Sequence, residues 1–589
     1  MRKINRYYLI VLILFSVGFA GCSSLLDPED DNHDTFDRVS YDPAYAEGLL
    51  MNVYSKLPSA SFSFNDVATD DAVSNDKFNS YLRMATGQWS AQYNPMSNWD
   101  NLNEGILYLN LFIPQIEKMT WSWANESINQ MFKARLTGEA YALRGLFRYH
   151  LLQTIAGKSA SGELLGIPLW NEFLEQDANF NMARAEYAAT VDSIHADFDR
   201  AMNYLPMDFL DVTSVAQMLP AFSAVNMTDY NTVFGKVSNQ RITKRIVMGF
   251  KARVALLAAS PAFNEANDAT LWVNAANASA SVLNQIQDIA GLDASGHIFF
   301  QAAKVDAVTV TADQKEMLWR GASNSLTNTL EKRMLPPGLN GNGEVNPSQN
   351  LVDAFPMKNG YPITHASGAY NAASPYTNRD PRLALYILYN GATLQNKVIK
   401  TAVGGGVNAK DSLSASTRTG YYLRKLIRED IVFSADGTAT TKKHYAVHMR
   451  YTELFLNYAE AANEAWGPTG IGTVATYSAK DVIAAIRKRA GITQPDAYLN
   501  TITTKEAMRE LIRNERRLEL CFEGFRFWDL RRWGLSLTEA AKGVNINKNA
   551  TTFSYVDVEL RVYQPYMQYT PLPQQEVLKF PALEQNAGW

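Results

Sequence analysis

Paired amphipathic segments recur along this chain of 589 residues and constrain its fold more than any other feature of the sequence. In residues 133–155, apolar side chains such as Leu136, Leu143 and Phe147 recur at the spacings of one helix face. A second amphipathic segment follows and ends at Pro206, where a helix is expected to stop. The pattern predicts two neighbouring helices, each with an apolar face to bury.

Further pairs of this kind are predicted near residues 43–118, 243–288 and 450–490, in addition to the pair near 133–206. With alanine at positions of close approach, the pairs resemble tetratricopeptide units, which stack to bury faces that no unit could bury alone. Residues 207–240 and 291–445 are rich in Gly, Asn, Ser and Thr, which predicts loop-rich insertions with a few short strands. The expected fold is therefore all-α and superhelical, but it is not a regular solenoid.

The N-terminus has the features of an export signal. Basic residues precede a short apolar run, Leu9 to Phe15, and the sequence FAGC that ends at Cys22 is similar to a bacterial lipobox. The run is shorter than the roughly 20 apolar residues that a membrane-spanning helix needs. We predict that residues 1–21 are removed and that the thiol of Cys22 receives a diacylglycerol, with more than one acyl chain giving durable anchoring.

Residues 22–40 are predicted to form a flexible tether that includes Asp27, Glu29, Asp30 and Asp31. Such an acidic stretch resembles the surface-export signal of some Gram-negative lipoproteins. It also fits a simple solvated linker, and the sequence leaves both interpretations open. The remaining residues, 41–589, are expected to form one domain.

Charge and cysteine content exclude several classes of protein. The formal net charge is only −4 with acids and bases mixed along the chain, so no nucleic-acid partner is expected. Cys22 and Cys521 are the only cysteines, so no intramolecular disulfide is possible once Cys22 is lipidated. Cys521 lies among apolar residues and is expected to be a buried thiol.

Motifs for zinc proteases, nucleotide binding, serine hydrolases and CxxC redox chemistry are all missing from the sequence. No catalytic residue, metal ligand or cofactor is therefore predicted. The charged and aromatic stretch from Arg513 to Gly534 is interpreted as a helical scaffold. Its arginines are expected to pair with Glu515, Glu519 and Glu523 at neighbouring helical turns.

Seven blocks, in order, carry a family resemblance: GEAYALRGLFRYHL with GIPLW, ITKRIVMGFKARVALLAASPAFN, NPSQNLVDAFPMKNGYPI, NRDPRLALYILYNG, RYTELFLNYAEAANEA, ERRLELCFEGFRFWDLRRWG and YTPLPQQEVLKFPALEQNAGW. The chain resembles SusD/RagB proteins through these blocks, which belong to a resemblance spanning residues 41–589. The resemblance implies a surface lipoprotein of the outer membrane that faces the exterior and binds oligosaccharide or polysaccharide. It also implies delivery of that ligand to a SusC-type TonB-dependent transporter.

Aromatic residues outside these blocks are the candidate glycan contacts, because sugar rings stack their C–H faces on flat side chains. Sugar hydroxyls also bond to Asn, Asp, Gln and Arg. The segment GQWSAQYNP lies in a loop where family members commonly carry ligand aromatics, and MLWRGASNS lies in a second such region. We expect the rings there to be exposed. The predicted glycan contacts are Trp89, Tyr93, Asp71, Arg83, Asn98, Trp319 and Arg320.

Two other functions remain open from the sequence. A peptide-binding subunit of a similar transporter complex is the main alternative, because related transporters also import peptides. An exported glycoside hydrolase would need two carboxylates about 5 to 10 Å apart in a cleft.

Overall fold

The computed structural model describes residues 42–58, 63–123, 125–175, 177–321 and 325–589. The predicted signal peptide, the lipidation site Cys22 and the tether of residues 22–40 lie outside the described residues.

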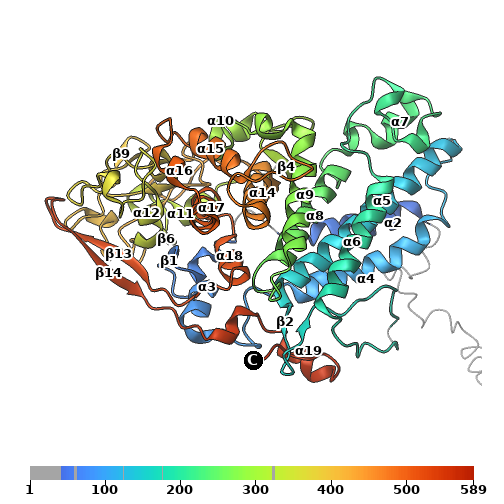
Figure 1. Cartoon of the computed structure of the whole chain (residues 1–589), viewed down its shortest axis with the longest axis horizontal. Helices are drawn as coiled ribbons and strands as arrows, with labels where there is room; N and C mark the ends of the chain where they lie inside the picture. Colours follow the sequence, from blue (N-terminus) through green and yellow to red (C-terminus); the bar gives the residue numbers. More distant parts are fainter. Residues whose placement is uncertain (1–41, 59–62, 124, 176, 322–324) are drawn as a thin grey trace, which may run out of the picture.

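Each of the four predicted helix pairs is present (Figure 1). They are α2 (Pro43–Ser55) with α4 (Trp99–Ile116), α5 (Glu126–Ile155) with α6 (Tyr187–Tyr204), α8 (Lys244–Ala259) with α9 (Ala269–Leu283), and α14 (Tyr451–Trp466) with α15 (Ala479–Arg489). Helix α5 contacts both α4 and α6, α6 contacts α8, and α9 contacts both α8 and α14. The pairs therefore stack in chain order, which confirms the predicted α-superhelix.

Two glycines let α6 pack closely on α5. A Cβ added at Gly138 would lie 2.6 Å from Cγ of Leu205, and one added at Gly145 would lie 2.7 Å from Cε1 of Phe198. Real Cβ atoms do not approach other atoms this closely in a packed interior, so a larger residue would push the helices apart. The same tight packing buries both Leu205 and Phe198 completely.

The insertion at residues 207–240 is more ordered than the expected loop, because it contains α7 (Met227–Phe234). The side chain of Asn226 caps this helix by accepting a hydrogen bond from the amide of Asp229 at 2.8 Å. Tyr230, Val233 and Phe234 form its buried face. The prediction of a loop-rich insertion at residues 207–240 therefore missed this helix.

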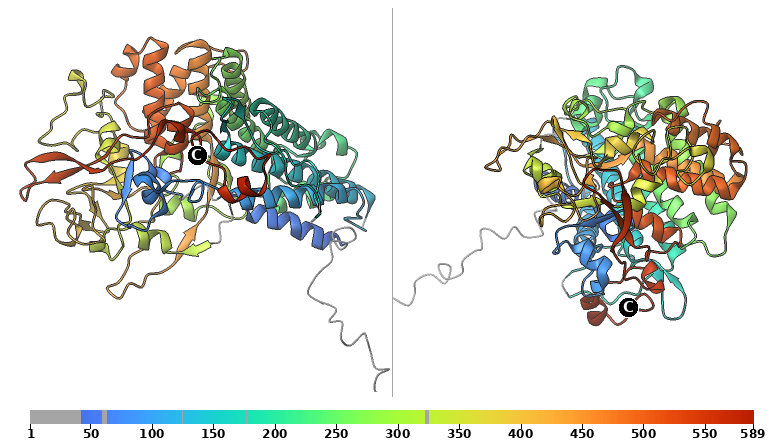
Figure 2. Two further views of the ribbon diagram at one scale, coloured as in Figure 1. Left: turned by 90° about the horizontal axis from the view of Figure 1, so that it is seen from below. Right: turned by 90° about the vertical axis from the view of Figure 1, so that its left-hand side faces the viewer.

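The rest of the described chain forms a loop-rich half with its own apolar core (Figure 2). Its strands pair two at a time: β1 (Ala72–Ser74) with β6 (Val345–Pro347), β4 (Met317–Arg320) with β12 (Val447–Arg450), β5 (Ser325–Thr327) with β11 (Lys442–His444), β7 (Ile387–Leu388) with β10 (Tyr422–Leu423), β8 (Thr393–Leu394) with β9 (Lys397–Val398), and β13 (Ala541–Ile546) with β14 (Phe553–Glu559). The last pair projects from the molecule as a hairpin. A further pair, β2 (Gly157–Lys158) with β3 (Leu164–Leu165), follows α5.

The remaining helices are short, apart from α17. They are α3 (Ser80–Arg83), α10 (Ala302–Asp306), α11 (Thr329–Met334), α12 (Gln349–Ala354), α13 (Pro381–Tyr386), α16 (Ala497–Thr501), α17 (Lys505–Leu520), α18 (Arg526–Arg532) and α19 (Gln574–Lys579). Within the described ranges, none of the helices has the length and apolar character to cross a membrane.

The charged stretch from Arg513 to Gly534 forms α17 and α18 and lies mostly in the interior. Its glutamates do not pair at neighbouring turns, so that prediction is wrong. Glu515 binds Arg382 at 2.5 Å, and Glu523 binds Lys425 at 2.6 Å. Because these carboxylates face inward, they bind cations that other segments supply, and the stretch joins distant parts of the chain.

Candidate functional site

A cavity of about 390 Å³, here called the central cavity, lies where the helix pairs meet the loop-rich half. Helices α5, α8, α14 and α18 and strand β12 contribute its walls. The lining also includes four residues that are at least partly exposed and are here called the rim: Pro58, Tyr81, Pro95 and Asn98. The cavity is therefore built from segments that are far apart in the sequence.

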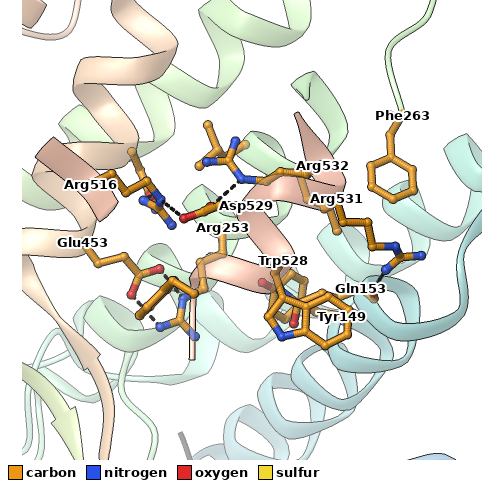
Figure 3. A pocket seen from close by; sticks show the side chains of 14 residues that line it. Tyr149, Gln153, Arg253, Phe263, Glu453, Arg516, Trp528, Asp529, Arg531 and Arg532 are labelled. Atoms are coloured by element: carbon orange, nitrogen blue, oxygen red, sulfur yellow. Dashed lines mark hydrogen bonds and ion pairs between the residues drawn. The ribbon is translucent and has the colours of Figure 1, made fainter. Parts of the chain in front are cut away.

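A smaller space of about 40 Å³ shares part of its lining with the central cavity (Figure 3). Tyr149, Gln153 and Trp528 line both spaces. The ring of Trp528 is half-buried, meets Phe527 edge-on at a centroid distance of 5.1 Å, and has the guanidinium of Arg531 at 5.6 Å from its centre. Its neighbours thus hold an aromatic ring in place at the cavity wall.

The charged groups of the cavity are already bonded to one another. Arg253 donates to both carboxylate oxygens of Glu453, each at 2.6 Å, and to the carbonyl oxygen of His448 at 2.8 Å. In Figure 3, Asp529 lies between Arg516 and Arg532 and accepts hydrogen bonds from both. Such fixed pairs can present donors and acceptors without carrying a free charge.

Two histidines in the cavity are neutral near pH 7. Burial, together with the charge of Arg253, lowers the pKa of His150 to about 3 and that of His448 to about 4. Glu523 also lines the cavity; burial alone would raise its pKa, but Arg450 and Lys425 outweigh burial and lower it. The cavity therefore offers hydrogen bonds and an aromatic surface.

Asn98 is the one predicted contact that lines the central cavity. It is exposed and precedes α4 as the N-cap residue, but its side chain makes no capping hydrogen bond. Its amide is thus available to a ligand at the rim.

Trp89 is buried, with 4% of its surface exposed, so the expectation of an exposed ring is wrong. Its ring packs against Phe527, Tyr563 and Trp589 at centroid distances of 5.9, 5.9 and 4.9 Å. Its indole nitrogen donates to Oδ1 of Asn94 at 3.0 Å. Residues near the C-terminus therefore cover the face that was expected to meet sugar.

Trp319 and Arg320 are also buried, which contradicts their expected exposure on a loop. Both belong to β4, where Trp319 packs on Phe250 and on His448. The Arg320 guanidinium forms an ion pair with Asp313. Trp319 thus packs against His448, which lines the central cavity, but Trp319 itself does not line it.

The remaining predicted contacts lie elsewhere. Asp71 is fully buried and binds Arg517 at 2.5 Å, so it is not accessible to a ligand. Tyr93 and Arg83 are partly exposed and stack on each other at 4.9 Å, but they do not line the central cavity. Their role in ligand binding stays a prediction.

Sequence reasoning missed Trp528, because it interpreted the whole stretch from Arg513 to Gly534 as scaffold. Helical spacing does not single out this ring. Phe527, Asp529, Leu530, Arg531 and Arg532 of α18 are all buried, and Trp528 lies on the same side of the helix as Arg531, three positions on.

Candidate metal ligands do not cluster in the part of the chain that the structure describes. Across the described ranges, there is no group of three or more His, Cys, Asp or Glu residues that could hold a metal ion. The only cysteine in those ranges, Cys521, is buried, and burial raises the pKa of its thiol to about 12.

Comparison with solved structures places this fold among SusD-like proteins. A SusD-like protein from Bacteroides fragilis matches with a TM-score of 0.70 and 22% identity, covering 95% of this chain and 100% of its own. A SusD-like carbohydrate binding protein from the same species matches with a TM-score of 0.69 and 22% identity, covering 93% and 100%. Surface glycan-binding protein A from Bacteroides fluxus matches with a TM-score of 0.56 and 17% identity, covering 93% and 99%. At these identities the likeness establishes the fold alone.

Comparison with family models identifies the family of this chain. A search of curated proteins found no match. A model described as "Starch-binding associating with outer membrane" matches residues 26–226, and the model described as "SusD family" matches residues 296–589. This membership supports carbohydrate binding and association with the outer membrane. The chain belongs to the SusD family.

Proposed function

We propose that this protein is a cell-surface lipoprotein that binds oligosaccharide in its central cavity and delivers it to a SusC-type TonB-dependent transporter. Anchoring would use lipid on Cys22, which follows the export signal. The family description, which associates such chains with the outer membrane, supports this location.

The observation that carries the proposal is the composition of the central cavity. A half-buried ring, Trp528, stands in the wall, and an unbonded amide, Asn98, stands at the rim. Neutral histidines and an ion pair whose partners already bind each other also line the cavity. An aromatic face with dipolar hydrogen-bonding groups matches a sugar ring, whose C–H face stacks while its hydroxyls bond sideways.

We also propose that the cavity binds without cleaving. A glycoside hydrolase needs one carboxylic acid with a raised pKa and a second free carboxylate about 5 to 10 Å away. Glu453 is held by Arg253, and Glu523 is held by Arg450 and Lys425. Neither carboxylate is free to attack or to protonate a glycosidic oxygen.

Isothermal titration against a panel of oligosaccharides, beginning with maltoheptaose, tests the proposal. Asn98→Ala should weaken binding about tenfold, because it removes one hydrogen-bonding amide at the rim. Asn101→Ala is the matched control, since Asn101 is exposed on the same helix and does not line the cavity. Equal affinity of both variants for every bound oligosaccharide would exclude the central cavity as the site.

Peptide binding is the alternative function, and the same titration decides it. A panel of neutral peptides should give no heat of binding that Asn98→Ala reduces. Peptide binding at this rim, without oligosaccharide binding, would favour the peptide-importing class.

A further inference from the structure

The helical half contains a second cavity, here called the helical groove, with a volume of about 1250 Å³. It lies between α4, α5, α6 and the segment that precedes α6. It shares no lining residue with the central cavity.

One wall of the helical groove carries positive charge. Arg144 and Arg148 both bind the same carboxylate, that of Asp197, at 2.6 and 2.7 Å. Arg200 lies nearby on α6, is exposed, and has its guanidinium 5.4 Å from the centre of the Tyr141 ring. Arg200 has no carboxylate partner among the residues that the structure describes. Two of the three guanidinium groups on this wall therefore share one carboxylate, and the third, Arg200, binds none of the described carboxylates.

A second side of the groove carries negative charge. Glu172 and Glu175 line the groove from the segment before α6, and both are exposed. Neither forms an ion pair within the described parts of the chain, although Arg200 lines the same groove. Arg200 and the two glutamates of the groove thus remain unpaired with each other, and their charged groups are available to a ligand.

Aromatic rings also line the groove. Tyr108, Tyr141, Phe173 and Phe180 are each half-buried. Phe180 also meets Trp170 at a centroid distance of 6.2 Å. The rings give the groove a flat apolar surface beside its charged groups.

We propose that the helical groove is a second carbohydrate-binding site that takes a neutral oligosaccharide. A hydroxyl donates a hydrogen bond to a carboxylate and accepts one from a guanidinium, so a sugar can bond both kinds of wall at once. An anionic ligand would be repelled by Glu172 and Glu175, and a cationic ligand would be repelled by Arg200. The half-buried rings would stack on the C–H faces of the sugar.

This inference rests on the proposed carbohydrate-binding function but uses a separate set of residues, so the two can fail independently. The test is titration of the mature chain with neutral α-linked and β-linked oligosaccharides, and with neutral peptides of similar length. The variants are Arg200→Gln, which removes the guanidinium charge, and Glu172→Gln, which removes the carboxylate charge at equal side-chain size; both residues are exposed. The control is Arg333→Gln, an exposed arginine on α11 that does not line the groove.

For at least one oligosaccharide, we expect a binding event that Arg200→Gln and Glu172→Gln each weaken about tenfold, as loss of a charge-assisted hydrogen bond should. Arg333→Gln and Asn98→Ala should leave that event unchanged. Hydrogen exchange should show protection of residues 107–115 and 193–200 on addition of the same sugar. If no oligosaccharide gives an event that the groove variants weaken, or if only peptides do so, the proposal is wrong. If the groove variants weaken binding of a sugar but Asn98→Ala weakens binding of none, the helical groove remains a carbohydrate-binding site and the central cavity is excluded as one.

Discussion

Replacing Trp89 with alanine should destabilise the protein and leave ligand affinity unchanged. Only 4% of the surface of Trp89 is exposed. Its ring packs on Phe527, Tyr563 and Trp589. Truncation of a buried tryptophan costs about 3 to 5 kcal/mol of unfolding free energy. Loss of the hydrogen bond from the indole nitrogen to Asn94 adds about 1 kcal/mol.

Urea denaturation followed by circular dichroism measures this loss. We expect about 4 kcal/mol, which falls within the stability of a typical domain, so the variant should still fold. Tyr93→Ala is the matched control in the same loop. Its ring is half-buried and stacks on Arg83, and its hydroxyl donates a long hydrogen bond of 3.4 Å to the carbonyl oxygen of Ser80, so truncation should cost about 1 kcal/mol.

Titration of the folded Trp89→Ala variant supplies a second readout. Its affinity for oligosaccharide should equal that of the wild type, because the ring faces the C-terminal residues and not a cavity. A loss of stability below about 1 kcal/mol, combined with a tenfold loss of affinity, would refute this account of Trp89.

Three further predictions concern anchoring, catalysis and pH. Cys22→Ala should move the protein from the membrane fraction to the soluble fraction without changing its circular dichroism spectrum; equal membrane retention in cells lacking the transporter would contradict lipidation. Incubation with any bound oligosaccharide should release no reducing ends above a buffer blank, and release abolished by Glu453→Gln would show catalysis. The pKa of His150 falls from 6.5 in the unfolded chain to about 3 in the folded protein, so its contribution to stability is lost as pH falls below 6.5. Between pH 6 and pH 4, stability of His150→Gln should therefore decline less steeply than that of the wild type, by about 1.4 kcal/mol per pH unit in urea titrations; equal slopes would show that His150 is protonated in the folded state.

The helix pairs could be predicted from the sequence because their signal is local. Apolar residues at helical spacing, with Pro206 at one end, mark α5 and α6 without reference to the rest of the chain. The short strands could not be placed in the same way. Strand β1 pairs with β6, which lies far along the sequence, and neither has a pattern that identifies its partner.

Exposure of individual side chains was the least predictable feature. The burial of Trp89 depends on Tyr563 and Trp589, which return from the C-terminal end to cover it. Glu515 and Glu519 are fully buried and bind cations from distant segments, although helical spacing alone suggested pairs with arginines at neighbouring turns. In both cases a distant segment decides the outcome, and a local pattern carries no information about that segment.

A crystal structure of the protein with the tightest-binding oligosaccharide of the panel tests the central claim most directly. The account predicts sugar density in the central cavity, with one ring stacked on Trp528 and a hydroxyl bonded to the amide of Asn98. Full occupancy at any other place on the molecule, with the central cavity holding only water, would contradict it.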